Sequence, residues 1–183
     1  MYKRQGAIAC AFIQANAENT ESKIFRISTN ETDLILQVGE NGRLYQSYLG
    51  KKLLHDADIN NFRWDIHAAS DGSVSQRGWE VYSGSGNEDY YEPAIAIQHN
   101  DGKTSTYLYY VSSSTQDVEG GKETTINLRD DKYPVDVTLH YIAYPEENVI
   151  KTWSEIKHQE NKPIMLSTYA STMLYFNYPE YYL

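Results

Sequence analysis

The strongest constraint on the fold is a series of short segments in which apolar and polar residues alternate. The clearest lies within Val135–Tyr144, where every second side chain is apolar from Val135 to Tyr141. Because strand side chains point alternately to two faces, this pattern predicts a strand with one buried face. Such segments recur at roughly ten-residue spacing without a persistent helical period, which predicts an all-β fold, an antiparallel β-sandwich.

Turn signals separate the predicted strands. Asn41-Gly42 and Asp101-Gly102 are typical of hairpin turns. Residues 53–61 are less regular and have room for one helical turn. Further strands are predicted at residues 24–27, 34–38, 44–49, 79–82, 94–97, 106–112, 123–128, 149–157 and 164–176.

Composition excludes several classes of protein. The 183 residues fit one domain, and the net charge of -9 would repel a polyanion, so we expect no nucleic-acid partner. No apolar run is long enough to span a membrane. The 17 tyrosines suit strands, sugar-binding faces and subunit interfaces, because the ring is apolar and the hydroxyl is polar. Cys10 is the only cysteine, so one chain can form neither a disulfide nor a thiolate metal site.

The N-terminal residues resemble a secretory signal peptide. Lys3 and Arg4 precede a short apolar run at residues 7–13, and Ala15-Asn16-Ala17 fits a small-x-small cleavage site. The short run indicates that the peptide is partly truncated. We therefore expect a signal peptide at residues 1–17, a mature β-sandwich domain at residues 18–183, and a periplasmic or extracellular product.

No motif for nucleophilic, phosphate-binding or metalloprotease chemistry is present in the sequence. Asp56, Asp58 and Asn60 imitate the opening of a calcium loop. Asn61 replaces the glycine expected at the sixth position, and His67 replaces the closing glutamate, so we predict no calcium site. The five histidines are scattered singly and are expected to be surface or sheet residues. The residues alone indicate a secreted β-sandwich that contacts carbohydrate or another domain.

The stretch Trp79 to Ile97, WEVYSGSGNEDYYEPAIAI, presents carboxylates and phenols beside a glycine turn and a strand. Such a stretch suits a polar, hydroxylated ligand or a subunit contact, and an ordinary sheet edge has the same features. Here the chain resembles the N-terminal domain of glycoside hydrolase family 36, over residues 33–183. The matching residues are Gly42-Arg43-Leu44, Tyr48-Leu49-Gly50-Lys51, Glu80, Tyr82, Gly84, Gly86 and Asp89-Tyr90-Tyr91-Glu92-Pro93-Ala94. Tyr91, Thr152 and Thr168 stand where many members have arginine.

The resemblance implies a supersandwich that precedes a (β/α)8 barrel in a retaining α-galactosidase. The family's two catalytic aspartates lie in the barrel, and this chain is expected to stop before it, so we expect no catalytic residue here. No metal or organic cofactor is implied. The implied partners are an α-galactoside oligosaccharide, the chain's own barrel and other subunits of a homo-oligomer. An apolar face that packs on the barrel would then be exposed in this chain.

One residue, Asp65, is predicted to bind substrate. Phe62-Arg63-Trp64-Asp65 aligns with a segment that, in some family members, contributes an aspartate to the sugar site of a neighbouring subunit. A carboxylate accepts hydrogen bonds from vicinal hydroxyls, and such charge-assisted bonds are strong. The alternative is that Asp65 only solvates a sheet edge.

Three other functions fit the same sequence. The domain could belong to an α-N-acetylgalactosaminidase or a raffinose-type galactosyl transferase, which differ in barrel residues. It could also be a stand-alone carbohydrate-binding module, or a purely structural sandwich.

Overall fold

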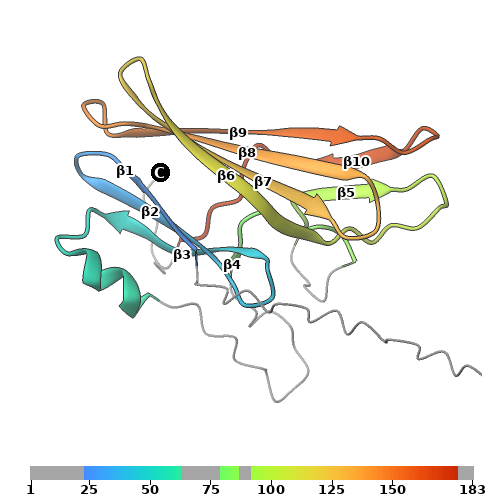
Figure 1. Cartoon of the computed structure of the whole chain (residues 1–183), viewed down its shortest axis with the longest axis horizontal. Coiled ribbons are helices and arrows are strands. Elements are labelled where there is room, and N and C mark those ends of the chain that lie inside the picture. Colours follow the sequence, from blue (N-terminus) through green and yellow to red (C-terminus); the bar gives the residue numbers. More distant parts are fainter. Residues whose placement is uncertain (1–22, 63–78, 87–91, 177–183) are drawn as a thin grey trace, which may run out of the picture.

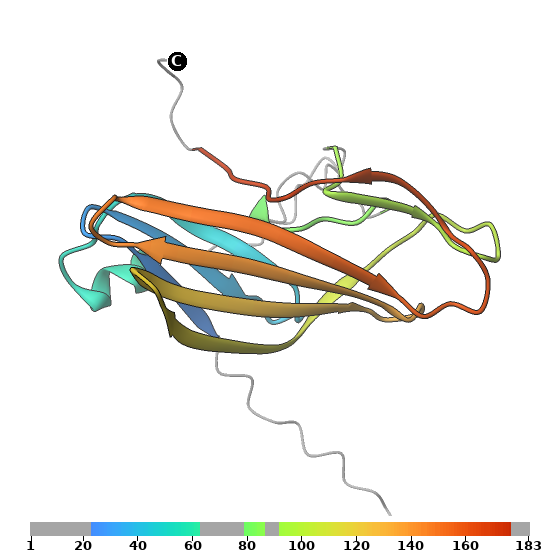
Figure 2. The same cartoon turned by 90° about the horizontal axis from the view of Figure 1, so that it is seen from above.

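The computed structural model describes residues 23–62, 79–86 and 92–176. Two four-stranded antiparallel sheets lie face to face (Figures 1 and 2). The first has the order β1-β2-β3-β4, with strands β1 (Ile24–Ser28), β2 (Thr32–Val38), β3 (Leu44–Lys51) and β4 (Trp79–Glu80). The second has the order β6-β7-β8-β9, with strands β6 (Leu108–Val118), β7 (Gly121–Asp130), β8 (Val135–Tyr144) and β9 (Val149–His158).

A third, two-stranded sheet lies beside one end of the β6–β9 sheet (Figure 2). It pairs β5 (Ile95–Gln98) with β10 (Met165–Tyr169) in antiparallel register. One short 3-10 helix, η1 (Asp56–Asn61), follows β3. The predicted antiparallel β-sandwich is therefore confirmed.

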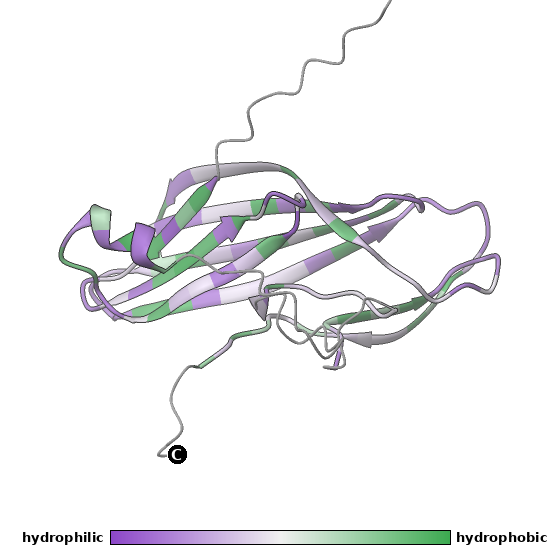
Figure 3. Ribbon diagram, turned by 90° about the horizontal axis from the view of Figure 1, so that it is seen from below, coloured by the Kyte–Doolittle hydropathy of each residue, from purple (hydrophilic) through white to green (hydrophobic). Residues whose placement is uncertain are grey.

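The core lies between the two large sheets. Leu34 and Leu36 of β2 face Ile126 of β7 and Val137 and Leu139 of β8, and all five are at most 2 % exposed. In Figure 3 hydrophobic and hydrophilic residues alternate along much of the β6–β9 sheet. In β8 the apolar residues from Val135 to Tyr141 are buried and the polar residues between them are half-buried, whereas β2 is buried on both faces, with Ile35 at 0 % exposed. Burial of each such side chain stabilises the fold by about 1.5–3 kcal/mol. The alternation seen in the sequence is therefore what joins the sheets.

The strand β8 fixes the register of its sheet. It pairs with β9 from Val135↔His158 to Tyr144↔Val149, and with β7 from Arg129↔Asp136 to Lys122↔Ala143. A slip of one residue would turn its apolar side chains toward solvent. The sequence predicted the bounds of β8 correctly.

Both predicted turns are present, but only the first joins a hairpin, because β2 pairs with β3 whereas β5 pairs with β10 and not with β6. Gly42 has φ +76 in the β2–β3 turn, and Gly102 has φ +88 in the turn after β5. These are left-handed backbone conformations that glycine adopts without steric cost.

The other predicted strands are present, but their ends differ from the predicted ones. The strand predicted at residues 164–176 is much shorter than expected. The strand β6 continues to Val118, beyond the predicted residue 112, whereas β4 ends at Glu80. The predicted strand at residues 164–176 ends at Tyr169. Beyond it, the hydroxyls of Tyr82 and Ser154 donate to the carbonyl of Ala170 at 2.7 and 2.8 Å. The Ala170 amide still donates to the Ala94 carbonyl at 2.8 Å, so one backbone bond beyond β10 remains, while side-chain hydroxyls supply the partners of the Ala170 carbonyl.

Residues 1–17, with Cys10, and Asp65 lie outside the described residues. In the described part of the chain, no helix has the length and hydropathy that a membrane crossing requires.

Leu139→Ala tests the position of the core. We expect the free energy of unfolding to fall by about 2–5 kcal/mol, because the substitution leaves a cavity between the sheets. Chemical denaturation followed by tryptophan fluorescence measures the change. Thr125→Ala on the outer face of β7 is the matched control, with an expected loss below about 1 kcal/mol. Equal losses for the two variants would contradict this assignment of faces.

Candidate functional site

The described residues closest in sequence to the segment with Asp65 are Phe62 and Trp79. The candidate site is therefore the region around β4, which begins at Trp79. Five side chains or backbone groups meet there and are called the β4 cluster: Arg43, Gln46, Trp79, Glu80 and Tyr175.

The register of β3 and β4 divides the cluster between two faces of the sheet. Tyr45 pairs with Glu80 and Gln46 pairs with Trp79, so each pair shares a face. Tyr45 and Gln46 are both 1 % exposed, which shows that β3 is covered on both sides at this point.

A buried ion pair occupies one face of the β4 cluster. Arg43 Nε donates to Glu80 Oε1 at 2.9 Å, and Arg43 Nη2 donates to Glu80 Oε2. The two side chains are 9 % and 6 % exposed. The bidentate geometry fixes β4 against the β2–β3 turn, where Asn41 Oδ1 accepts from the Arg43 amide at 3.1 Å. Because its charge is neutralised in place, Glu80 is a structural carboxylate.

The other face holds the C-terminal segment. Gln46 Nε2 donates to the Tyr175 carbonyl at 2.6 Å, and the Tyr175 amide donates to Gln46 Oε1 at 3.1 Å. The Tyr175 ring stacks on Trp79 at 5.8 Å between centroids, and its hydroxyl donates to the Glu80 carbonyl at 3.1 Å. One amide side chain thus imitates a strand partner for a residue far along the chain.

The two hydrogen bonds between Gln46 and Tyr175 form a clamp that the sequence did not predict. Gln46 had one signal, a polar amide in the middle of a tyrosine-rich strand, LYQSYLGK. The partner at Tyr175 lies in a segment that was predicted to be a regular strand, so the pairing could not be inferred.

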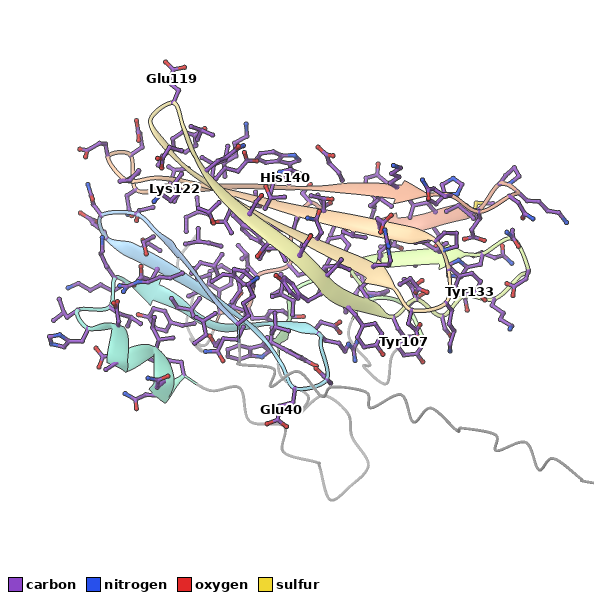
Figure 4. All side chains as sticks on the ribbon, in the orientation of Figure 1. Glu40, Tyr107, Glu119, Lys122, Tyr133 and His140 are labelled. Carbon is purple, nitrogen blue, oxygen red and sulfur yellow. The ribbon has the colours of Figure 1, made fainter. Side chains whose placement is uncertain are left out.

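A second polar cluster lies near the turn after β5. His99 Nδ1 and Glu160 Oε1 are 2.7 Å apart, and the Asn100 amide donates to Glu160 Oε2 at 3.0 Å. Tyr133 stacks on His99 at 3.5 Å between ring centroids. Figure 4 shows Tyr133 at this end of the domain, together with Tyr107. The cluster ties the β5 turn to the loop between β9 and β10.

The His99 cluster includes a hydroxyl in a position typical of nucleophilic sites. Thr106 Oγ1 lies 3.3 Å from His99 Nε2, so threonine, histidine and glutamate form a connected series. Thr106 is fully buried, and the His99 and Glu160 side chains are 0 % and 1 % exposed. Substrate cannot reach this hydroxyl, and the series is a structural one.

The carboxylate of Asp33 is buried and structural too. Burial would raise its pKa, but hydrogen bonds from Arg26, Ser28 and the Leu53 amide hold the pKa below its usual value. Burial acts the same way on Glu160, where the bonds from His99 and the Asn100 amide likewise lower the pKa. Both groups are therefore ionised in the folded protein at neutral pH.

The outer face of the β6–β9 sheet has a third polar cluster. His140 Nδ1 lies 2.8 Å from Glu123 Oε1, and Gln116 Nε2 donates to Glu123 Oε2 at 2.7 Å. Trp153 of β9 stacks on His140 at 4.4 Å between centroids. In Figure 4, His140 lies on the β6–β9 sheet. Within residues 23–62, 79–86 and 92–176, no group of three or more His, Cys, Asp or Glu side chains could hold a metal ion.

Comparison with known proteins identifies the family of this β-sandwich. Residues 42–183 match the model of the glycosyl hydrolase family 36 N-terminal domain. The chain belongs to this family. The resemblance that the sequence motifs indicated is thereby confirmed.

Known relatives are much longer than this chain. It is 22 % identical over 178 residues to alpha-galactosidase 1 of Pediococcus pentosaceus, a match that covers 85 % of this chain and 24 % of the relative. A variant family 36 α-galactosidase of Geobacillus stearothermophilus, crystallised with raffinose, superposes with a TM-score of 0.69 at 23 % identity. That match covers 82 % of this chain and 24 % of the enzyme.

The α-galactosidase of Lactobacillus brevis shares the fold as well. It superposes with a TM-score of 0.68 at 18 % identity, over 84 % of this chain and 24 % of that enzyme. The chain thus spans about a quarter of the length of these relatives.

Acid titration tests the role of Glu160. Because the folded pKa values of Asp33 and Glu160 are lowered, their contribution is complete above the unfolded-state pKa of about 4. We expect the free energy of unfolding to fall as the pH drops below that value. Glu160→Gln should cost about 1–3 kcal/mol at pH 7, and the difference from wild type should shrink toward pH 3. Glu119→Gln at an exposed turn is the control, and a Glu160→Gln cost that is independent of pH would contradict this prediction.

Proposed function

We propose that this chain is the N-terminal β domain of a secreted α-galactosidase that removes terminal α-galactose from oligosaccharides with retention. The observation that carries the proposal is the family match over residues 42–183, together with superposition on α-galactosidases. One of those enzymes was crystallised with raffinose and another variant with stachyose, which supports an α-galactoside as substrate.

In this proposal the catalytic aspartates come from a separate (β/α)8 barrel, and the β domain supports the oligomer and the rim of the active site. The buried carboxylates Asp33, Glu80 and Glu160 are each held by cationic, histidine or backbone partners. They are therefore unsuited to a retaining mechanism, which needs two carboxyl groups facing one sugar about 5–5.5 Å apart.

An exposed apolar strip supports contact with a further domain. It consists of Met165, Leu166, Tyr169, Leu174 and Phe176, which are 62, 37, 70, 39 and 58 % exposed. Five large apolar side chains within one short stretch are unusual on a free surface and typical of an interface. We assign the strip to the contact with the rest of the parent enzyme.

We further propose that the protein is exported from the cytoplasm. The signal-like residues 1–17 support a periplasmic or extracellular location, with cleavage after Ala17.

The isolated chain should not cleave an α-galactoside, because it lacks the barrel aspartates. The measurement is release of 4-nitrophenol from 4-nitrophenyl α-galactoside by the purified chain, with a family 36 α-galactosidase as the positive control. A purified sample whose activity follows the protein peak through successive columns would refute this assignment of roles. Binding of raffinose without hydrolysis would favour the carbohydrate-binding module.

Asp65→Ala in the full-length parent tests the rim. Loss of one charge-assisted bond to bound galactose should cost about 1.5–3 kcal/mol, or about one to two decades in kcat/KM. Asp58→Ala, on the exposed helix η1, is a matched control that should leave kcat/KM unchanged. The oligomeric state must be measured in parallel by light scattering. An intact oligomer whose kcat/KM changes less than about twofold would show that Asp65 is structural.

A further inference from the structure

The proposed function has the β domain support an oligomer without naming a surface, and this inference rests on that part of it; the free edge of β6 is the candidate surface. We propose that it is a self-association surface, on which the β6 strands of two copies pair antiparallel and join two β6–β9 sheets into one continuous sheet. The proposal does not depend on the enzymatic activity of the parent.

The backbone of β6 is available along one side. In the order β6-β7-β8-β9 it is an outer strand, and Figure 2 shows it along the margin of the sheet. The Tyr110 amide donates to the Gly42 carbonyl at 2.8 Å. Beyond Tyr110, the backbone hydrogen bonds of β6 within the described residues go to β7. An unpaired strand edge is a template for another strand.

The available part of β6 is regular. A bulge interrupts the pairing between Tyr110 and Ser112. From Ser112↔Asn127 to Val118↔Gly121, the register then continues without a shift. Residues 112–118 are therefore seven consecutive residues in regular antiparallel register. In such an edge strand, the backbone N–H and C=O groups of every second residue point away from β7 and are available to a partner strand.

The same stretch is open to solvent. Ser112, Ser114 and Gln116 are exposed on the outer face, and Thr115 and Asp117 are exposed on the other. Glu119 lies at the tip of the β6–β7 hairpin, which projects beyond the rest of the domain (Figure 4). A second copy can therefore approach β6 without displacing described side chains.

Charge distinguishes β6 from the other long edges. Residues 111–116, VSSSTQ, contain no charged side chain. The edge strand β9 carries Lys151, Glu155 and Lys157, and its Ser154 already bonds to the C-terminal segment. The edge strand β1 spans only five residues and includes Arg26. Charged side chains at an edge discourage pairing with another sheet, and β6 has none over this run.

The edge strand β10 lacks charges as well, but it is short and irregular. It spans five residues, and its pairing shifts between Leu166 and Thr168. A bulge at the centre of an edge twists it away from a partner. The longer, unbroken run on β6 is therefore the better match for a second strand.

The sequence of β6 is complementary to itself. In antiparallel pairing about a twofold axis at Ser114, Ser113 faces Thr115 and Ser112 faces Gln116 of the other copy. Facing hydroxyl and amide side chains form favourable cross-strand pairs. Asp117 then faces Val111, so no two like charges oppose each other.

Sedimentation equilibrium of the full chain over a wide concentration range tests the proposal. We expect a reversible monomer–dimer equilibrium that Ser114→Lys weakens at least about tenfold, because two lysines would meet at the twofold axis. Ser114→Glu should weaken it similarly, and an equimolar mixture of the two variants should restore association. Hydrogen exchange of the amides from Ser112 to Asp117 should slow as wild-type protein is concentrated.

Two matched controls separate the edge from other surfaces. Thr125→Lys adds the same charge on the same face, one strand inward, and should leave the dimer largely intact. Met165→Lys adds it at the β10 edge and should also leave the dimer intact. A chain that remains monomeric at all concentrations would overturn the proposal. So would a dimer that Met165→Lys disrupts and Ser114→Lys does not, or variants that fail to associate when mixed.

Discussion

The structure depends on burial of the facing apolar sides of the two large sheets. Leu34 and Leu36 on one sheet, and Ile126 and Leu139 on the other, form much of the apolar layer between the sheets. Polar residues are consequently placed at the ends of the sandwich, on its outer faces and at its edges. The Arg43–Glu80 pair and the His99 cluster lie beside turns, where they fix loops to the sandwich.

This distribution accounts for the buried carboxylates in the described part of the chain. Ionised groups that are buried away from solvent are stable only when they are paired and hydrogen-bonded. Asp33 and Glu160 meet that condition through several donors each. A group held in this way keeps its proton state fixed near neutral pH and cannot serve as an acid in a reaction cycle.

The sequence predicts the strands well, because side-chain alternation and glycine turns are local signals. Val135–Tyr144 and the Gly42 turn follow directly from neighbouring residues. The end of β10 was harder to predict, since the Ala170 carbonyl accepts from the side-chain hydroxyls of Tyr82 and Ser154. Such contacts between residues far apart in the chain leave no periodic signal. The predicted sugar contact, Asp65, remains a prediction, because it lies outside the described residues.

The clamp between Gln46 and Tyr175 has a consequence for synthesis of the protein. The two residues are separated by 129 positions, so the environment of β4 is completed only after Tyr175 has left the ribosome. The β6–β9 meander, whose partners are neighbours in sequence, can form earlier. Until Tyr175 arrives, Trp79 lacks its stacking partner and Gln46 lacks its backbone partner. The nascent domain therefore carries an incomplete face until Tyr175 has been synthesised, and chaperones that bind exposed aromatic strands would encounter it in that interval.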